Sequence, residues 1–257
     1  DSFTCSGATV VSDRRIRCHK TTGHGTQDFT HTVYNSCNPA FVEWGRRVGV
    51  DNMYLYMGKL GLLAKTGIDL SGEAGTIIHK QENVGAVELA TMSFGQSFQI
   101  TPVQMLRAVA AIVNGGKLVT PHFGLYTSSS DGSVVNEFAY STEEEAISLQ
   151  TSEMMKQILE GVVSEGGGTK AYIEGYSIGG KTATSQKLPR GSGKYISSFI
   201  GFAPAENPQV IAMCLIDEPT GVYYGGTIAA PVVKTLYENI LPYLGIERSV
   251  QLEKNSD

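Results

Sequence analysis

The sequence predicts an α+β fold in which an antiparallel sheet is packed by helices and joined to a mostly helical part. Apolar residues recur at helical spacing in several segments before residue 175, whereas three strand-like segments separated by turns follow from residue 176. An amphipathic segment after these strands predicts a closing helix. With 257 residues and 41% hydrophobic content, the chain can bury a sizeable core. We therefore expect one domain, mainly helical over about 1–175, with strands and a last helix over about 176–257.

The chain is expected to begin as a loop and to continue as a helix. Gly, Ser, Thr and Arg are frequent in Asp1–Thr26 without sustained periodicity, which predicts a loop with a short hairpin around Val10–Cys18. A helix is predicted at about 38–48, because apolar residues fall on one face, a proline lies in the first turn and Gly49 ends the pattern. The triplet Ser36-Cys37-Asn38 therefore lies at the N-terminal end of this helix.

Two later helices and their flanking segments are also marked. Thr101-Pro102-Val103-Gln104 combines a capping box with a first-turn proline, and this helix should bury Val103, Leu106, Val109, Ala110 and Val113. Thr151 is expected to cap a helix at about 151–163 with a buried stripe of Met155, Ile158, Leu159 and Val162. A shorter helix is expected from Asp51 through Lys59. Residues 127–150 predict an exposed hairpin or loop, and the three glycines of Glu165–Thr169 predict a mobile connection.

The sheet is predicted from three consecutive segments. Tyr176–Ser185, Tyr195–Ala203 and Gln209–Asp217 are separated by turn-rich pieces, which favours an antiparallel meander. The amphipathic helix at about Ala229–Leu244 could then pack across this meander.

The first of these strands, within Tyr176–Lys187, carries the residues of most chemical interest. Its sequence YSIGGKTATSQK places two glycines before a lysine and a threonine, and we expect a strand edge bare enough for a ligand's backbone. Lys181 offers a positive charge for a carboxylate, and Thr182 offers a hydroxyl beside it.

The charge balance argues against one class of partner. Twenty basic and 25 acidic residues give a formal net charge of −5, and no long basic run is present, so nucleic acid is a poor candidate ligand. No apolar run approaches the ~20 residues that span a bilayer, and the N-terminus lacks the features of a signal peptide. We expect a chain that is soluble as given and that an anchor could precede.

Several motifs occur in one order over nearly the whole chain and carry a family resemblance. Beside Ser36-Cys37-Asn38 and Lys181-Thr182-Ala183, they are Gly23-His24-Gly25, Asn35–Phe41, Lys65–Leu70, Ser93–Gln96 with Thr101-Pro102, Asn114-Gly115-Gly116 and Phe199–Pro204. In this arrangement the sequence resembles the transpeptidase domain of class B penicillin-binding proteins, the serine acyltransferases that cross-link peptidoglycan. Its cysteine-containing segments look most like those of sporulation-specific members from clostridial bacteria. The resemblance implies the penicillin-binding fold and an enzyme on the extracytoplasmic face of the membrane.

The family's nucleophile motif is missing from this sequence. The resemblance implies a serine followed by lysine three residues later, with the lysine as base, yet no serine in the chain has lysine at that position. In the family's order this motif and two sheet strands precede the Cys5 region. We therefore expect the chain to be the C-terminal portion of one transpeptidase domain, inactive alone, with an unpaired sheet edge for the missing N-terminal part.

The resemblance also implies roles for the residues of the two remaining motifs. Ser36 would relay a proton between the catalytic lysine and the leaving amine, and Asn38 would hydrogen-bond the donor peptide and that lysine. Lys181 would set the local positive potential. Thr182 and Thr184 would bind the terminal carboxylate of a D-Ala-D-Ala stem peptide or of a β-lactam, and the Thr184 N–H would provide half of the oxyanion hole. This chemistry requires no cofactor.

Ala183 departs from the glycine that the family usually carries after Lys-Thr. Its methyl group narrows the approach to the strand, so we expect β-lactams with bulky substituents to acylate slowly.

The cysteines near the N-terminus leave three interpretations open. Cys5 and Cys18 could form a disulfide, all the thiols could be free and buried, or Cys5, Cys18 and Cys37 with His24, or else His19, could bind a structural zinc ion. Zinc is favoured slightly, because Cys37 has no evident partner if the other two pair. Because Cys37 is next to Ser36, binding or loss of such a metal would change the geometry of Ser36. Cys214, within an apolar run, is expected to be a core thiol.

A second lysine-threonine-glycine triplet and two nearby carboxylates are expected to have structural roles only. The second triplet Lys65-Thr66-Gly67 lies in an irregular segment, and Asp69 and Glu73 lack metal-ligand spacing. Two rival functions remain: a β-lactam-sensing or β-lactam-hydrolysing relative, and a non-catalytic scaffold among division or sporulation proteins.

Overall fold

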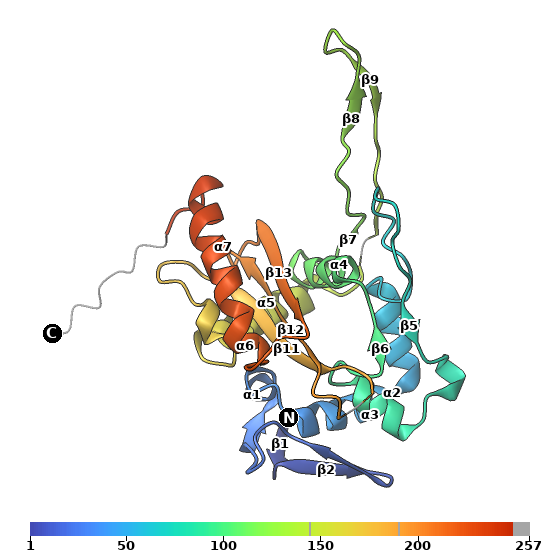
Figure 1. The fold of residues 1–257 in the computed structure, drawn as a ribbon, viewed down its shortest axis with the longest axis vertical. Coiled ribbons are helices and arrows are strands. Elements are labelled where there is room, and N and C mark those ends of the chain that lie inside the picture. Colours follow the sequence, from blue (N-terminus) through green and yellow to red (C-terminus); the bar gives the residue numbers. More distant parts are fainter. Residues whose placement is uncertain (144, 190, 249–257) are drawn as a thin grey trace, which may run out of the picture. The chain divides into compact units, whose positions relative to one another are not determined.

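The computed structural model describes residues 1–143, 145–189 and 191–248, which form two compact units. One unit combines Asp1–Phe41 with the chain from Met154 onward, and the other comprises Val42–Glu153. Helices α2 (Asn38–Lys59) and α5 (Leu149–Ser164) run across the boundaries. The predicted α+β class is confirmed, because the chain forms both helices and antiparallel sheets (Figure 1).

The larger sheet lies in the first unit and has the predicted meander topology. Strands β11 (Gly179–Gln186), β12 (Tyr195–Ala203) and β13 (Val210–Asp217) pair antiparallel in this order, with Lys181 opposite Ile200. Within the described residues, β13 has β12 as its one strand partner, so its outer edge is unpaired there.

Helix α7 (Ala230–Tyr243), preceded by the short α6 (Gly225–Ile228), packs against the sheet as predicted (Figure 1). The core between them includes Phe199 and Ala203 of β12, together with Val233 and Leu241 of α7. Tyr237 is fully buried and its hydroxyl donates a hydrogen bond to the Gly201 carbonyl. This bond fixes the position of α7 along β12.

The two glycines of β11 serve packing rather than ligand access, which corrects the expectation of a bare edge at this point. Gly179 and Gly180 are both buried. A Cβ on Gly179 would lie 2.2 Å from the Phe202 ring, and one on Gly180 would lie 2.5 Å from the Phe199 ring. The glycines therefore leave room for large side chains of the neighbouring strand.

The loop expected over Asp1–Thr26 is wrong for most of its length. Strand β1 (Ser2–Cys5) pairs with β4 (Gly25–Asp28), and β2 (Ala8–Val11) with β3 (Arg14–Arg17) forms the predicted hairpin. Each strand has four residues, too few for a clear alternation of apolar and polar positions. A short helix α1 (Phe29–Tyr34), capped by Asp28, also escaped prediction.

Helix α2 contains both helices that were predicted for this region, and they meet at a kink. Gly49 lies inside its bounds with φ 76° and ψ 168°, so it interrupts the helical backbone where the sequence placed a helix end. The residues that follow continue as helix to Lys59, as expected from Asp51.

Helix α5 begins before its predicted cap. The Ser148 hydroxyl accepts a hydrogen bond from the Thr151 N–H, so Ser148 takes the role expected of Thr151. Ile158 and Val162 of the predicted stripe pack against Val33 of α1. The glycine-rich segment after α5 leads into the single turn η2 (Thr169–Ala171).

The second unit is built around α4 (Pro102–Val113), whose capping box is confirmed. The Thr101 hydroxyl accepts from the Gln104 N–H, and the Gln104 side chain accepts from the Thr101 N–H. Of the predicted buried face, Val113 is confirmed and the other positions are wrong, because α4 instead buries Gln104, Arg107, Ala108 and Ala111. Hydrogen bonds from the Gln104 side chain to the Ala64 carbonyl and the Thr76 hydroxyl satisfy one of these polar groups.

Short elements complete the second unit. The strand pairs are β5 (Ile77–Ile78) with β6 (Phe98–Gln99), β7 (Leu118–Val119) with β10 (Thr142–Glu143), and β8 (Tyr126–Ser128) with β9 (Val134–Glu137). The last pair is the exposed hairpin predicted within 127–150. The turn η1 (Gln81–Asn83) and helix α3 (Ala86–Met92) had not been predicted.

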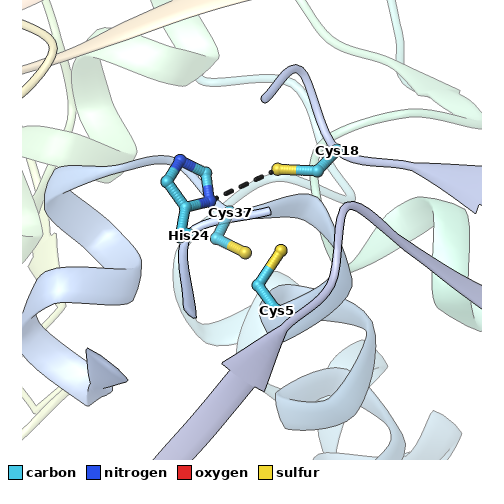
Figure 2. Close-up of side chains that lie close together, drawn as sticks. All are labelled: Cys5, Cys18, His24 and Cys37. Atoms are coloured by element: carbon cyan, nitrogen blue, oxygen red, sulfur yellow. Dashed lines mark hydrogen bonds between the residues drawn. The ribbon is translucent and has the colours of Figure 1, made fainter. Parts of the chain in front are cut away.

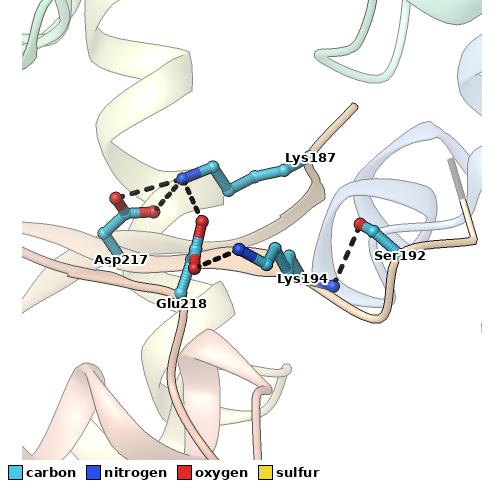
Figure 3. A network of polar contacts seen from close by, with 5 residues as sticks. All are labelled: Lys187, Ser192, Lys194, Asp217 and Glu218. Carbon is cyan, nitrogen blue, oxygen red and sulfur yellow. Dashed lines mark hydrogen bonds and ion pairs between the residues drawn. The ribbon is translucent and has the colours of Figure 1, made fainter. Parts of the chain in front are cut away.

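An ion-pair network links the two ends of the segment between β11 and β12 (Figure 3). Lys187 Nζ lies 2.9 Å from an Asp217 oxygen and 2.8 Å from Glu218 Oε1, and Lys194 Nζ lies 2.8 Å from Glu218 Oε2. The network joins both sides of this connection to the end of β13. Across the described ranges, no helix combines the length and apolar character that crossing a bilayer requires.

Candidate active site

Ser36 lies in the tight turn that joins α1 to α2. Its φ of 47° is in the left-handed region, which is uncommon for a residue other than glycine. The turn is held by hydrogen bonds from the Ser36 N–H to the Val33 carbonyl and from the Cys37 N–H to the Thr32 carbonyl. Backbone hydrogen bonds on both sides of the turn thus fix the position from which the Ser36 side chain projects.

Lys181 of β11 contacts Ser36 directly, although 145 positions separate them in the sequence. Its Nζ donates hydrogen bonds of 3.0 Å to Ser36 Oγ and of 3.0 Å to the Thr182 carbonyl. Burial lowers the pKa of Lys181 to about 8. The structure therefore brings together the first residues of the two motifs that the sequence singled out.

Asn38 is the first residue of α2, and its side chain points to a different partner. Its Nδ2 donates a 3.2 Å hydrogen bond to the Arg17 carbonyl at the end of β3. This contact ties the start of α2 to the N-terminal hairpin.

The start of α6 covers the end of the Lys181-Thr182-Ala183 motif. The Gly225 N–H donates a 3.0 Å hydrogen bond to the Thr184 hydroxyl, whose own proton stays available for a ligand. A Cβ on Gly225 would lie 2.3 Å from the carbonyl oxygens of Ala183 and Ser198. Glycine is therefore required for this close approach to the strand, while Ala183 itself is exposed.

Two further features beside this strand were not predicted. A Cβ on Gly226 would lie 2.6 Å from the Gly167 carbonyl and 3.2 Å from Thr182 Cγ2, so the glycine segment after α5 lies next to the motif. Tyr223 stacks on Tyr195 of β12 with ring centroids 4.0 Å apart. The signal in the sequence was the run of two tyrosines and two glycines at 223–226, which looks like an ordinary loop without its neighbours.

The four predicted metal ligands converge on one point (Figure 2). Cys5 ends β1, Cys18 follows β3, His24 precedes β4 and Cys37 precedes α2. One ligand atom from each lies within 4.8 Å of the others, and Cys18 Sγ is 3.5 Å from His24 Nδ1. All four cysteines of the chain, Cys214 included, carry free thiols, so the disulfide alternative is not what the structure shows.

The chemistry of this donor set fits a tetrahedral zinc ion. Burial raises the pKa of Cys37 to about 12 and raises that of Cys18. Burial alone would raise the pKa of Cys5, but hydrogen bonds from the Gly7 and His24 backbones and from the Cys37 and Cys18 side chains together lower it. Burial also lowers the pKa of His24, which keeps the imidazole neutral and able to bind a metal. A metal ion would have to displace the thiol protons, so its affinity should increase with pH.

The second Lys-Thr-Gly triplet is occupied by a side chain of its own loop. The Glu73 carboxylate accepts hydrogen bonds from the Thr66 N–H and hydroxyl, each 2.6 Å, and from the Gly67 N–H at 3.2 Å. Asp69 similarly accepts from the Phe123 and Gly124 N–H groups. Both carboxylates hold loops together, in accord with their structural interpretation.

Comparisons with known proteins find matches over most of this chain. The family model described as penicillin binding protein transpeptidase domain matches residues 1–238. The chain is 42% identical over 260 residues to stage V sporulation protein D of Bacillus subtilis, covering 99% of this chain and 40% of that protein. It is 33% identical over 224 residues to the probable peptidoglycan D,D-transpeptidase PenA of Neisseria meningitidis serogroup A, covering 85% and 37%. The chain thus spans about two fifths of the length of these relatives.

Solved structures give the same picture. Penicillin binding protein 3 of Mycobacterium tuberculosis, complexed with ampicillin, superposes with a TM-score of 0.87 at 25% identity, covering 98% of this chain and 59% of that chain. The D,D-transpeptidase domain of an Eggerthella lenta peptidoglycan glycosyltransferase superposes with a TM-score of 0.85 at 21% identity, covering 95% and 60%, which shows the shared fold.

Proposed function

This chain belongs to the penicillin-binding protein transpeptidase family and has its fold, and from that premise we propose that it forms two walls of a peptidoglycan D,D-transpeptidase site. The complete enzyme would cross-link stem peptides through a serine acyl-enzyme. The observation that supports this proposal best is the 3.0 Å hydrogen bond from Lys181 Nζ to Ser36 Oγ. It joins residues from two distant motifs beside an exposed strand segment.

The positions of the residues support the role proposed for each. A serine oxygen supplied from outside this chain attacks the carbonyl carbon between two D-alanines, the peptide C–N bond breaks, and the leaving amine takes a proton through Ser36. Lys181 Nζ supplies positive charge for the substrate carboxylate and orients Ser36 Oγ. Thr182 and Thr184 offer hydroxyls to that carboxylate, and the Thr184 N–H offers a donor to the developing oxyanion, typically worth ~3 kcal/mol. Asn38 would turn from the Arg17 carbonyl toward the donor peptide when substrate binds.

The partners of the complete protein follow from the same proposal. β-Lactams would acylate the same serine, and an N-terminal part with the Ser-x-x-Lys motif would pair with the outer edge of β13. The site would act outside the cytoplasmic membrane. The 42% identity to a protein named for sporulation supports a sporulation role, with division or sporulation proteins as neighbours.

We also propose that Cys5, Cys18, His24 and Cys37 bind a structural zinc ion. When bound, zinc would cross-link the N-terminal strands to the start of α2 and take no part in acyl transfer. Cys37 follows Ser36 directly, so the metal would hold the turn that presents the Ser36 hydroxyl.

Acylation kinetics of the complete protein test the proposed function. Ser36→Ala removes the hydroxyl bonded to Lys181, and we expect the acylation rate with a fluorescent penicillin to fall about 10²–10³-fold. Ser130→Ala, at an exposed serine of the β8–β9 hairpin, is the matched control. An acylation rate that Ser36→Ala leaves unchanged would reject the proposed role.

A further inference from the structure

A cavity of about 510 Å³ opens within the unit Val42–Glu153, and none of its lining residues belongs to the site described above. Its walls come from the end of α2, the segment at 61–67, α4, β7 and β10. This volume lies within the range of pockets that bind small molecules.

The cavity is lined by a buried cation, Arg107 of α4. Its side chain is 7% exposed, its Nε donates a 2.8 Å hydrogen bond to the Val119 carbonyl, and its Nη2 is 3.9 Å from the Glu143 carboxylate. The Glu143 side chain is 71% exposed, so water screens it and it compensates the buried charge weakly. A guanidinium has five N–H donors, and these two contacts leave further donors for a ligand.

The wall beside this guanidinium is bare backbone. Gly61 has φ +71°, and a Cβ there would lie 2.9 Å from Arg107 Nη1 and 3.2 Å from Leu118 Cδ2. A side chain at this position would therefore crowd the guanidinium that lines the cavity.

The remaining polar lining is cationic or hydroxylic, apart from Glu143. Lys65 is exposed and lines the cavity, and the Thr120 and Ser141 hydroxyls lie 3.1 Å apart. Glu73, which compensates Lys65 in part, is bound to the Thr66 and Gly67 amides and does not line the cavity. These amides are therefore taken, and an incoming anion would have to bind to Arg107.

We propose that this cavity binds a small oxyanion ligand, a carboxylate or a phosphate ester, with Arg107 as its buried anchor and Lys65 as a second cation. A planar guanidinium suits both oxyanions, because it can donate two parallel hydrogen bonds to either. The ligand compensates the buried charge that Glu143 leaves partly unpaired.

Nuclear magnetic resonance on the ¹⁵N-labelled full chain tests this site. The Arg107 Nε–H is buried and hydrogen-bonded, so it provides a signal that reports on the guanidinium. Acetate and methyl phosphate are titrated separately at constant ionic strength. We expect a saturable shift of this signal, and we expect Lys65→Met to weaken binding about three- to tenfold. Lys80→Met, at an exposed lysine outside the cavity, makes the same charge change and should leave binding unaltered.

A second variant tests the location without changing charge. Ala64 lines the cavity and is exposed, so Ala64→Leu adds volume there and should abolish the saturable shift. Saturation by methyl phosphate alone identifies a phosphate ester, saturation by acetate alone identifies a carboxylate, and saturation by both supports an unselective oxyanion site. Saturation by neither up to about 100 mM, or equal weakening by Lys65→Met and Lys80→Met, overturns the proposal. Unchanged binding in Ala64→Leu also overturns it.

Discussion

At the scale of single residues, Lys181 has both a fixed side-chain position and a lowered pKa. Its hydrogen bond to Ser36 orients the ammonium group, while burial brings its pKa to about 8. A lysine with the ordinary pKa would stay charged throughout the physiological range. Lys181 instead begins to lose its charge near neutral pH, and binding of a carboxylate should reflect that loss.

The affinity for carboxylate-bearing β-lactams should therefore fall as pH rises through about 8. Lys181 is charged below its pKa and neutral above it, and its charged fraction falls about tenfold between pH 7 and pH 9. We expect a similar weakening of pre-covalent binding in the complete protein, measured from the concentration dependence of acylation. A bound carboxylate favours the charged form, which moves the decline to higher pH. Lys181→Arg, which stays charged, should show no such decline, and a decline of equal size in that variant would reject Lys181 as its cause.

The proposed zinc site gives a second prediction for single residues. Cys18→Ser should reduce the zinc content of protein purified without added zinc from about one equivalent to well below one. Zinc at a thousandfold its dissociation constant stabilises by about 4 kcal/mol, so the melting temperature should fall by roughly 10 °C. Cys214→Ser, at the cysteine on β13 outside the cluster, is the control for both measurements. Wild-type protein with less than about 0.2 equivalents of zinc would contradict the proposal.

Ala183 offers a third prediction, on selectivity. Its side chain lies on an exposed part of β11, where a methyl group narrows the approach to the strand. The complete protein with Ala183→Gly should be acylated a few-fold faster by bulky cephalosporins. Removing the clash should lower the activation free energy by about 1 kcal/mol. The rate with unsubstituted penicillin should change little. Equal acylation rates of the wild type and of Ala183→Gly with the bulky cephalosporins would show that the Ala183 methyl group does not limit selectivity.

The residues of the candidate site differ in how far the sequence reveals them. Ser36 and Lys181 could be named because a hydroxyl at a helix start and a lysine on a glycine-rich strand form recognisable motifs. Gly225, Gly226 and Gly167 could not be named, because their role is to let separate segments approach the same strand. A close approach of that kind leaves no local pattern in the sequence.

At the scale of elements, long segments with a strong pattern were predicted well and short ones were not. The meander β11–β12–β13 and the cap of α4 follow from turn-separated strands and from a capping box. The strands β1 and β4 have four residues each and depend on a partner 20 or more positions away, so no local alternation marks them. Apart from Val113, the buried face of α4 was misassigned, because hydrogen bonds compensate the burial of Gln104, which apolar periodicity cannot foresee.

The contact between α7 and the sheet gives a prediction for elements. Tyr237→Phe removes a buried hydrogen bond to the Gly201 carbonyl and should lower the free energy of unfolding by about 1–2 kcal/mol. Chemical denaturation of the full chain measures this change. Tyr243→Phe at the end of the same helix is the control, because Tyr243 is 88% exposed and should lose less than about 0.5 kcal/mol. Equal effects of the two substitutions would show that the hydrogen bond does not stabilise this contact.

At the scale of the whole molecule, the chain carries two of three motifs that the family's chemistry requires. No serine in it has lysine three residues later, and the chain spans 40% of the length of its Bacillus subtilis relative. The outer edge of β13 has no strand partner within the described residues. These facts support the proposal that Ser36, Lys181 and Thr184 act together with a nucleophile from another part of the complete protein.

Peptide mapping after reaction with a fluorescent penicillin tests this account most directly. In the complete protein, we predict one covalent label per molecule, on a serine outside these 257 residues, and we predict that Lys181→Ala slows its formation. The chain by itself should gain no adduct in an intact-mass measurement. A stoichiometric label on any serine of this chain, Ser36 included, would contradict the account.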